Sequence, residues 1–169
     1  EVLVHLGASQ TTRGELRASA RGLLDALQRA GPPRRVAVGV MLPNGAPLVA
    51  AIFAVQAADA TYAPLNPRIS DRELVTVVES LHPAVIVTDT PDRVPADVAR
   101  AVLTAGGGWT VTGTIDPAAP TLGEDIAFVQ FTSGTTGRPK PVPLRGATVT
   151  ALMEGVVAKL RGGRAAASR

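Results

Sequence analysis

The chain of 169 residues is 46% hydrophobic and 18% charged, which is typical of a globular protein and excludes collagen-like, coiled-coil and low-complexity chains. It holds no cysteine, which excludes disulfides, thiolate metal sites and a cysteine nucleophile, and it has only five aromatic residues. The net charge of +3 is uneven: residues 138–169 hold seven Lys or Arg and one Glu, giving +6, and residues 1–137 carry −3, which argues against a nucleic-acid partner.

The first part of the chain alternates helical and extended patterns. Thr12 and Glu15 have the spacing of a capping box, and the apolar residues that follow recur at helical intervals, which predicts a helix over about 12–30. Valines alternate along 35–42, which is the period of a strand. The next segment, 47–60, is apolar nearly all round, so we expect a buried helix.

The same alternation continues toward the middle of the chain. Residues 61–65 form a short extended segment, and Ser70 with Glu73 is a second capping box, which predicts a helix that ends near residue 81. The run 84–88 is continuously apolar, as in a strand that is buried on both faces. This order predicts an α/β fold with a mainly parallel sheet flanked by helices.

The last third contains the remaining predicted elements. We expect a helix over 95–105, a strand over 109–115, a proline-rich loop over 116–124 and a strand over 126–131. We see no linker that would divide the chain in two.

Apolar residues at helical spacing predict a helix over 148–160, after which the periodicity is lost. We therefore expect one domain over 1–160 and an unstructured basic tail over 161–169.

A glycine-rich segment, Thr132-Ser-Gly-Thr-Thr-Gly-Arg-Pro-Lys140, follows the strand predicted over 126–131. Glycines allow backbone N–H groups to converge on an anion, hydroxyls donate further hydrogen bonds, and a lysine adds positive charge, so a triphosphate is the natural ligand. Pro139 breaks the P-loop pattern, and the two glycines do not have the spacing of a dinucleotide fingerprint. The alternative interpretation is a hydrophilic hairpin connection.

The same nine residues resemble the phosphate-binding signature of the adenylate-forming enzymes, which include acyl-CoA synthetases, peptide-synthetase adenylation domains and luciferases. Residues 35–44, which end in Leu-Pro-Asn, and residues 57–68, with Tyr-Ala-Pro-Leu-Asn-Pro, resemble two further segments of this superfamily. The resemblance implies that 1–160 is part of the large N-terminal domain of such an enzyme.

The resemblance implies the use of ATP and Mg²⁺ to convert a carboxylic acid into an acyl-adenylate, whose acyl group then passes to the thiol of coenzyme A or of a carrier protein. Arg138 occupies a variable position and is expected to be solvated. The residues that match the phosphate-binding motif, and are expected to hold the β- and γ-phosphates, are Thr132, Ser133, Gly134, Thr135, Thr136, Gly137 and Lys140.

Three residues depart from the superfamily's usual pattern. Pro141 replaces a glycine, Gly146 stands near the usual position of a histidine, and Asp59 replaces a glycine at a turn. The resemblance also implies that the catalytic lysine, the ribose-binding aspartate and the adenine-binding segment belong to parts of such an enzyme that lie beyond residue 169. We therefore assign no catalytic residue and no metal ligand, and we expect the chain to be inactive alone.

Our first hypothesis for function is the N-terminal part of an acyl-CoA synthetase, because no carrier-protein segment is present. The alternatives are part of a peptide-synthetase adenylation domain, a non-catalytic module that binds phosphate or nucleotide, and a truncated product without function. No apolar run approaches the roughly 20 residues of a membrane span, and no secretory signal pattern is present, so we expect no membrane span and a cytoplasmic location.

Overall fold

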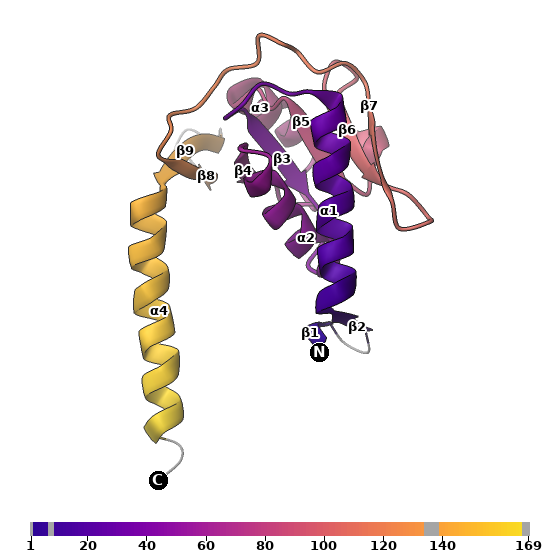
Figure 1. Ribbon diagram of the computed structural model, residues 1–169. Coiled ribbons are helices and arrows are strands. Elements are labelled where there is room, and N and C mark those ends of the chain that lie inside the picture. The colour runs from indigo at the N-terminus through magenta and orange to yellow at the C-terminus, as the bar shows by residue number, and fades with distance from the viewer. Residues whose placement is uncertain (1, 7–8, 134–138, 167–169) are drawn as a thin grey trace.

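The computed structural model describes residues 2–6, 9–133 and 139–166 (Figure 1). A hairpin of β1 (Val2–Leu6) and β2 (Ser9–Thr12) precedes the main sheet. The strands of that sheet, in chain order, are β3 (Ala37–Met41), β4 (Thr61–Pro64), β5 (Val85–Thr88), β6 (Ala99–Leu103), β7 (Trp109–Thr112), β8 (Ile126–Ser133) and β9 (Pro139–Arg145).

The spatial order of these strands is β7-β6-β5-β3-β4-β8-β9. The inner five run parallel to one another, and an antiparallel strand lies at each edge. The helices are α1 (Arg13–Ala30), α2 (Ala46–Ala57), α3 (Asp71–Leu81) and α4 (Gly146–Ala166). The predicted α/β class with a mainly parallel sheet is confirmed.

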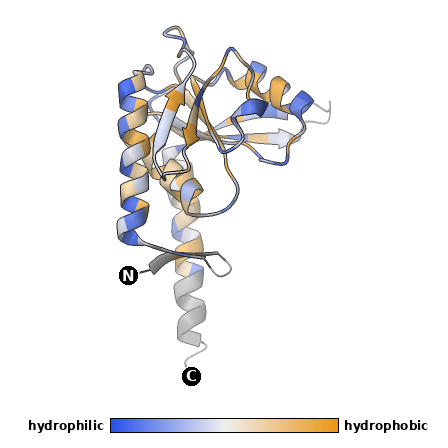
Figure 2. Cartoon of the chain, turned by 90° about the vertical axis from the view of Figure 1, so that its right-hand side faces the viewer, coloured by the Kyte–Doolittle hydropathy of each residue, from blue (hydrophilic) through white to orange (hydrophobic). Residues whose placement is uncertain are grey.

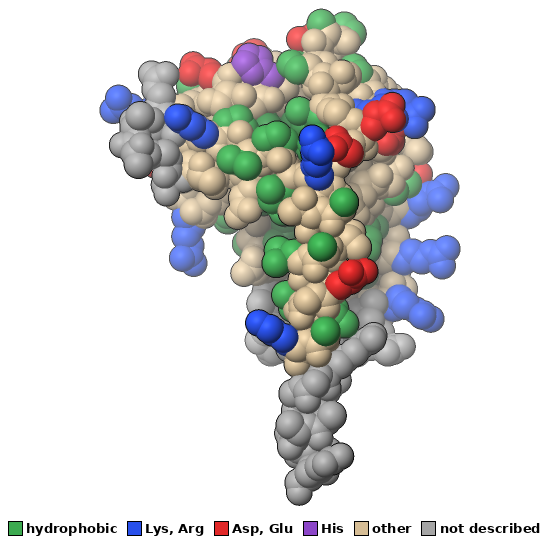
Figure 3. Space-filling model, turned by 90° about the vertical axis from the view of Figure 1, so that its left-hand side faces the viewer, with side chains coloured by type: hydrophobic (Ala, Val, Ile, Leu, Met, Phe, Trp, Pro, Cys, Tyr) green, Lys and Arg blue, Asp and Glu red, His purple; other side chains and the backbone are tan. Residues whose placement is uncertain are grey.

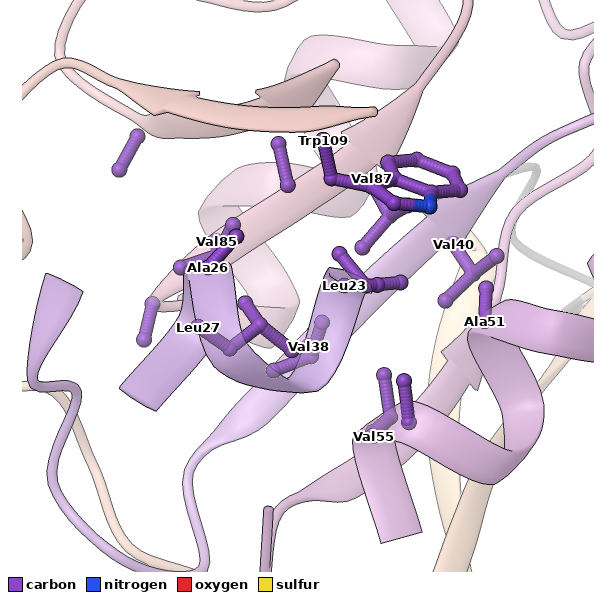
Figure 4. Close-up of a cluster of buried hydrophobic side chains, with 14 of the residues drawn as sticks. Leu23, Ala26, Leu27, Val38, Val40, Ala51, Val55, Val85, Val87 and Trp109 are labelled. Atoms are coloured by element: carbon purple, nitrogen blue, oxygen red, sulfur yellow. The ribbon is translucent and has the colours of Figure 1, made fainter. Parts of the chain in front are cut away.

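Two apolar cores lie on opposite faces of the sheet. The α1-side core joins α1 and α2 to the strands, as Figure 4 shows, and its members include Leu23, Leu27, Val38, Val40, Val55, Val85, Val87 and Trp109. The α3-side core joins α3 to the other face and contains Met41, Leu65, Leu74, Val77, Val78, Ile86, Val94 and Val98. Alternation along each strand sends successive side chains into different cores.

Both predicted capping boxes are confirmed. Thr12 Oγ1 accepts a hydrogen bond from Glu15 N at 3.2 Å, and Ser70 Oγ accepts one from Glu73 N at 3.3 Å. The side-chain and then the backbone hydrogen bond from Ser70 lower the pKa of Glu73 below its ordinary value of 4.5. Each box satisfies backbone donors that a helix start leaves unpaired, so both helix starts were predictable. Hydrophilic residues then recur along the outer side of α1 (Figure 2).

The predicted helix over 95–105 is wrong. Residues 99–103 form strand β6, which pairs in parallel with β5 and antiparallel with β7. Ala99 and Ala101 are buried in the α1-side core. Alanine and arginine favour helices in isolation, but here pairing on both sides overrides that local preference.

The predicted buried helix over 47–60 is buried on one face only, and Phe53 on α2 is 57% exposed. Only the face of α2 that carries Ala50, Ala51, Ala54 and Val55 is buried. Because the sequence of α2 is apolar nearly all round, it does not indicate which face of the helix packs against the core.

Helix α4 continues to Ala166, so residues 161–166 are helical and the predicted unstructured tail is wrong there; 167–169 lie outside the described residues. The loss of apolar periodicity after Leu160 therefore does not mark the end of this helix. Leu152 and Met153 of α4 are exposed. Figure 3 shows hydrophobic side chains at several points along the surface of this helix. In the described parts of the chain, no helix is long and apolar enough to cross a membrane.

The edge strand β9 carries prolines at alternate positions, 139, 141 and 143. Alternate residues of a strand direct their N positions to the same side, and proline is tolerated where that side faces away from the partner strand. The other edge of β9 therefore offers few N–H donors to a further strand, which protects the sheet from edge pairing.

A pair of leucine substitutions tests this assignment of the core. Leu27 is fully buried and Leu152 is 68% exposed. We expect Leu27→Ala to lower the free energy of unfolding by about 2–5 kcal/mol, and Leu152→Ala to change it by less than about 0.5 kcal/mol. Urea denaturation of the two variants measures both values, and equal losses would contradict the assignment.

Candidate phosphate-binding site

Strands β4 and β8 bring two distant parts of the chain to the same edge of the sheet. They are parallel neighbours, with Tyr62 opposite Phe128. The carboxyl end of β4 leads into the loop 65–70, and the carboxyl end of β8 leads into the segment 134–138. Loops that follow adjacent parallel strands form the usual ligand crevice of an open α/β sheet.

The β8–β9 hairpin brings the two ends of the predicted phosphate-binding motif together. Thr132 lies opposite Lys140, and Ser133 lies opposite Pro139. Thr132 and Lys140 are both exposed. The other predicted site residues, which are Gly134, Thr135, Thr136 and Gly137, lie outside the described residues, as does Arg138.

A cavity of about 330 Å³ lies beside the hairpin. Its walls include Leu65, Ile69, Val77 and Phe131, and its lining reaches Thr132 and Pro139, one on each side of the segment 134–138. No charged side chain is among the described residues that line it. The cavity was not predictable from the sequence, because its residues are far apart in the chain and look like ordinary core positions.

Gly39 on β3 supports one wall of this cavity. A Cβ at this position would lie 3.0 Å from Leu65 Cδ1 and 3.1 Å from Ile86 Cγ1, closer than ordinary van der Waals contact. The absence of a side chain lets Leu65 settle on the sheet, and Leu65 in turn borders the cavity. The strand pattern predicted β3 but gave this glycine no role.

The three departures from the family pattern have defined surroundings. Asp59 adopts φ 54° at the turn and its Oδ2 accepts a hydrogen bond from Arg34 Nε at 2.5 Å, so aspartate serves where glycine is usual. Pro141 lies opposite Phe131 in the hairpin. The N–H of Gly146 donates to the Asp125 carbonyl at 2.7 Å and begins α4.

Tyr62 of β4 is not among the described residues that line the cavity. It packs against the α1-side core, and burial raises the pKa of its phenol. Its residue type belongs to the segment that resembles the adenylate-forming enzymes, yet its position favours packing over contact with a ligand at the hairpin.

In the described ranges, no group of three or more His, Cys, Asp or Glu residues could hold a metal ion. Mg²⁺ that accompanies nucleotides is held largely by phosphate oxygens and water, with one or two protein carboxylates, so it does not need such a cage. Of the described motif residues, Thr132 offers a hydroxyl and Lys140 a positive charge to an anion.

The mainly parallel sheet, with helices on both faces, defines an α/β class of protein. The sequence profile of the family described as AMP-binding enzyme matches residues 1–167, and the chain belongs to this family. The predicted membership of the adenylate-forming superfamily is thereby confirmed.

Curated relatives include large synthetases of the peptide-synthetase type. A linear gramicidin synthase of Brevibacillus parabrevis is 29% identical over 84% of this chain and 3% of its own length. The PKS-NRPS hybrid synthetase psoA of Aspergillus fumigatus is 27% identical over 89% of this chain and 4% of its own length. The chain therefore spans a small part of these relatives.

Among solved structures, the amide bond synthetase McbA from Marinactinospora thermotolerans is 28% identical, with a TM-score of 0.72. The match covers 93% of this chain and 34% of McbA. The fold described above is therefore one that McbA shares.

Two glycine substitutions test the role of Gly39. We expect Gly39→Ala to lower the free energy of unfolding by about 1–3 kcal/mol, because Leu65 and Ile86 must shift. The control is Gly155→Ala in α4, where a Cβ meets no described atom within 4 Å. There alanine should preserve or raise helix content, because it is the better helix former. Circular dichroism and urea denaturation measure both effects, and a neutral Gly39→Ala would contradict the close contact.

Proposed function

We propose that this chain holds the β- and γ-phosphates of ATP on the segment from Thr132 to Lys140 and belongs to a protein that activates a carboxylic acid as its adenylate. The observation that carries the proposal is the hairpin register, which sets Thr132 opposite Lys140 at the carboxyl edge of the sheet. Membership of the AMP-binding enzyme family supports the same ligand.

In the proposed reaction, a carboxylate oxygen of the acid attacks the α-phosphorus of ATP. The bond from that phosphorus to the oxygen bridging to the β-phosphate breaks, and pyrophosphate leaves. The thiol sulfur then attacks the carbonyl carbon of the acyl-adenylate, AMP leaves with the electron pair of the broken C–O bond, and the thiol proton is released. Protein groups that donate hydrogen bonds to the phosphate oxygens stabilise the negative charge that accumulates on pyrophosphate.

The exposed Lys140 would contribute a positive charge to the phosphates, and the hydroxyl of Thr132 a hydrogen bond. Serine, threonine and glycine at 133–137 would complete the anion site through hydroxyls and backbone N–H groups. Mg²⁺, when bound with ATP, would neutralise part of the phosphate charge. These residues bind and orient the leaving group; they do not move a proton.

For the acid, we propose an amino acid and, for the acceptor, a carrier-protein thiol. The support is the peptide-synthetase type of relatives such as the linear gramicidin synthase. The sequence alone favours an acyl-CoA synthetase, with coenzyme A as acceptor. The relatives favour the alternative, so we do not extend the proposal to fatty acids.

The two lysines of the sequence give a matched test of the phosphate site. We expect Lys140→Met to weaken ATP binding roughly 10- to 100-fold, because a hydrogen bond to a charged group contributes about 1.5–3 kcal/mol. Lys159→Met, on the exposed surface of α4, should leave the affinity unchanged. Isothermal titration calorimetry with ATP and Mg²⁺, on the whole protein to which this chain belongs, measures both dissociation constants. Equal affinities of the wild type and Lys140→Met would overturn the proposed phosphate site.

A further inference from the structure

Arg93 joins the short turn between β5 and β6 to the loop that precedes α3. Its Nε donates to Asp71 Oδ1 at 2.9 Å, its Nη1 donates to the carbonyl of Pro67 at 2.8 Å, and its Nη2 donates to the carbonyl of Ile69. The side chain is 27% exposed. The donors of a guanidinium have a fixed planar arrangement, so three bonds define both the position and the orientation of the loop.

Arg93 is next to a residue that is packed in the core, and the loop that it contacts contains a hydrogen-bonded turn. Val94, the neighbour of Arg93, is buried in the α3-side core. Within the loop, Arg68 N donates to Asn66 Oδ1 at 3.0 Å, and Ile69 N donates to the Asn66 carbonyl at 3.0 Å. Arg93 therefore attaches a small, internally bonded unit to a packed part of the domain.

The other side of the same loop borders the cavity next to the hairpin. Asn66 and Ile69 line this cavity together with Phe131, Thr132 and Pro139. Ile69 and Phe131 also pack against the α3-side core. A displacement of the loop would therefore change the surroundings of Thr132 and Pro139, which flank the segment 134–138.

We propose that Arg93 is a positioning residue for phosphate binding: it holds the loop 66–70 in place as the wall that supports the β8–β9 hairpin. Arg93 itself lies in the turn Pro91–Arg93, outside the motif that resembles the family signature. The proposal rests on the proposed function, because it assumes that ATP binds at the hairpin. It gives a role to an arginine that the sequence patterns did not distinguish.

Three variants of the protein separate this role from general stability. Arg93→Met removes the donors of the guanidinium, and Arg93→Lys keeps the charge but loses their planar arrangement. Arg72→Met is the matched control, because Arg72 is an exposed arginine at the start of α3. Hydrogen–deuterium exchange reports on residues 66–70 and on strand β5, and calorimetry with ATP and Mg²⁺ reports on the site.

For Arg93→Met we expect faster exchange in 66–70, little change in β5, and ATP binding that is about 2- to 30-fold weaker. Arg93→Lys should give intermediate values, and Arg72→Met should match the wild type. Faster exchange in 66–70 with unchanged ATP affinity would overturn the positioning role, as would equal acceleration in 66–70 and β5. If the whole protein to which this chain belongs binds no ATP, that result would instead contradict the proposed function, and the exchange data would still decide whether Arg93 holds the loop.

Discussion

The parallel pairing of β4 with β8 is the contact on which the candidate site depends. Tyr62 and Phe128 are opposite each other, yet they belong to distant parts of the chain. Because both strands point the same way, the loop 65–70 and the segment after β8 emerge at one edge of the sheet. Gly39 leaves room for Leu65 at the start of this loop. Arg93 donates hydrogen bonds to the backbone carbonyls of the same loop.

Elements with local signals were predictable from the sequence, and elements that depend on distant partners were not. The capping boxes at Thr12 and Ser70 define helix starts through residues three positions apart, and the structure has both. Strand β6 carries helix-favouring residues and becomes a strand only because β5 and β7 flank it. The exposure of Phe53 depends likewise on which neighbours α2 finds, which its uniformly apolar sequence does not encode.

The candidate site likewise has one part that was predictable from the sequence and one part that was not. The glycine-rich motif predicts an anion site and a family from consecutive residues, and the family is confirmed. The cavity beside it combines residues from β4, α3, β8 and β9, and Arg93 supports it from a fifth element. Such a constellation has no sequence pattern, because each residue alone resembles a core or loop position. The alternate prolines of β9 also have no evident role in the sequence alone. Their role in limiting edge pairing can be inferred only once β9 is known to be an edge strand.

The central claim is that the hairpin segment holds the pyrophosphate part of ATP during activation of an amino acid. Carboxylate-dependent exchange of pyrophosphate into ATP, measured on the whole protein to which this chain belongs, tests it most directly, with Mg²⁺ and a panel of amino acids, aryl acids and fatty acids. We predict exchange that depends on an amino acid. Exchange with fatty acids alone would contradict the proposed acid class, and ATP binding without exchange for any acid would contradict the claim in favour of a non-catalytic nucleotide-binding module.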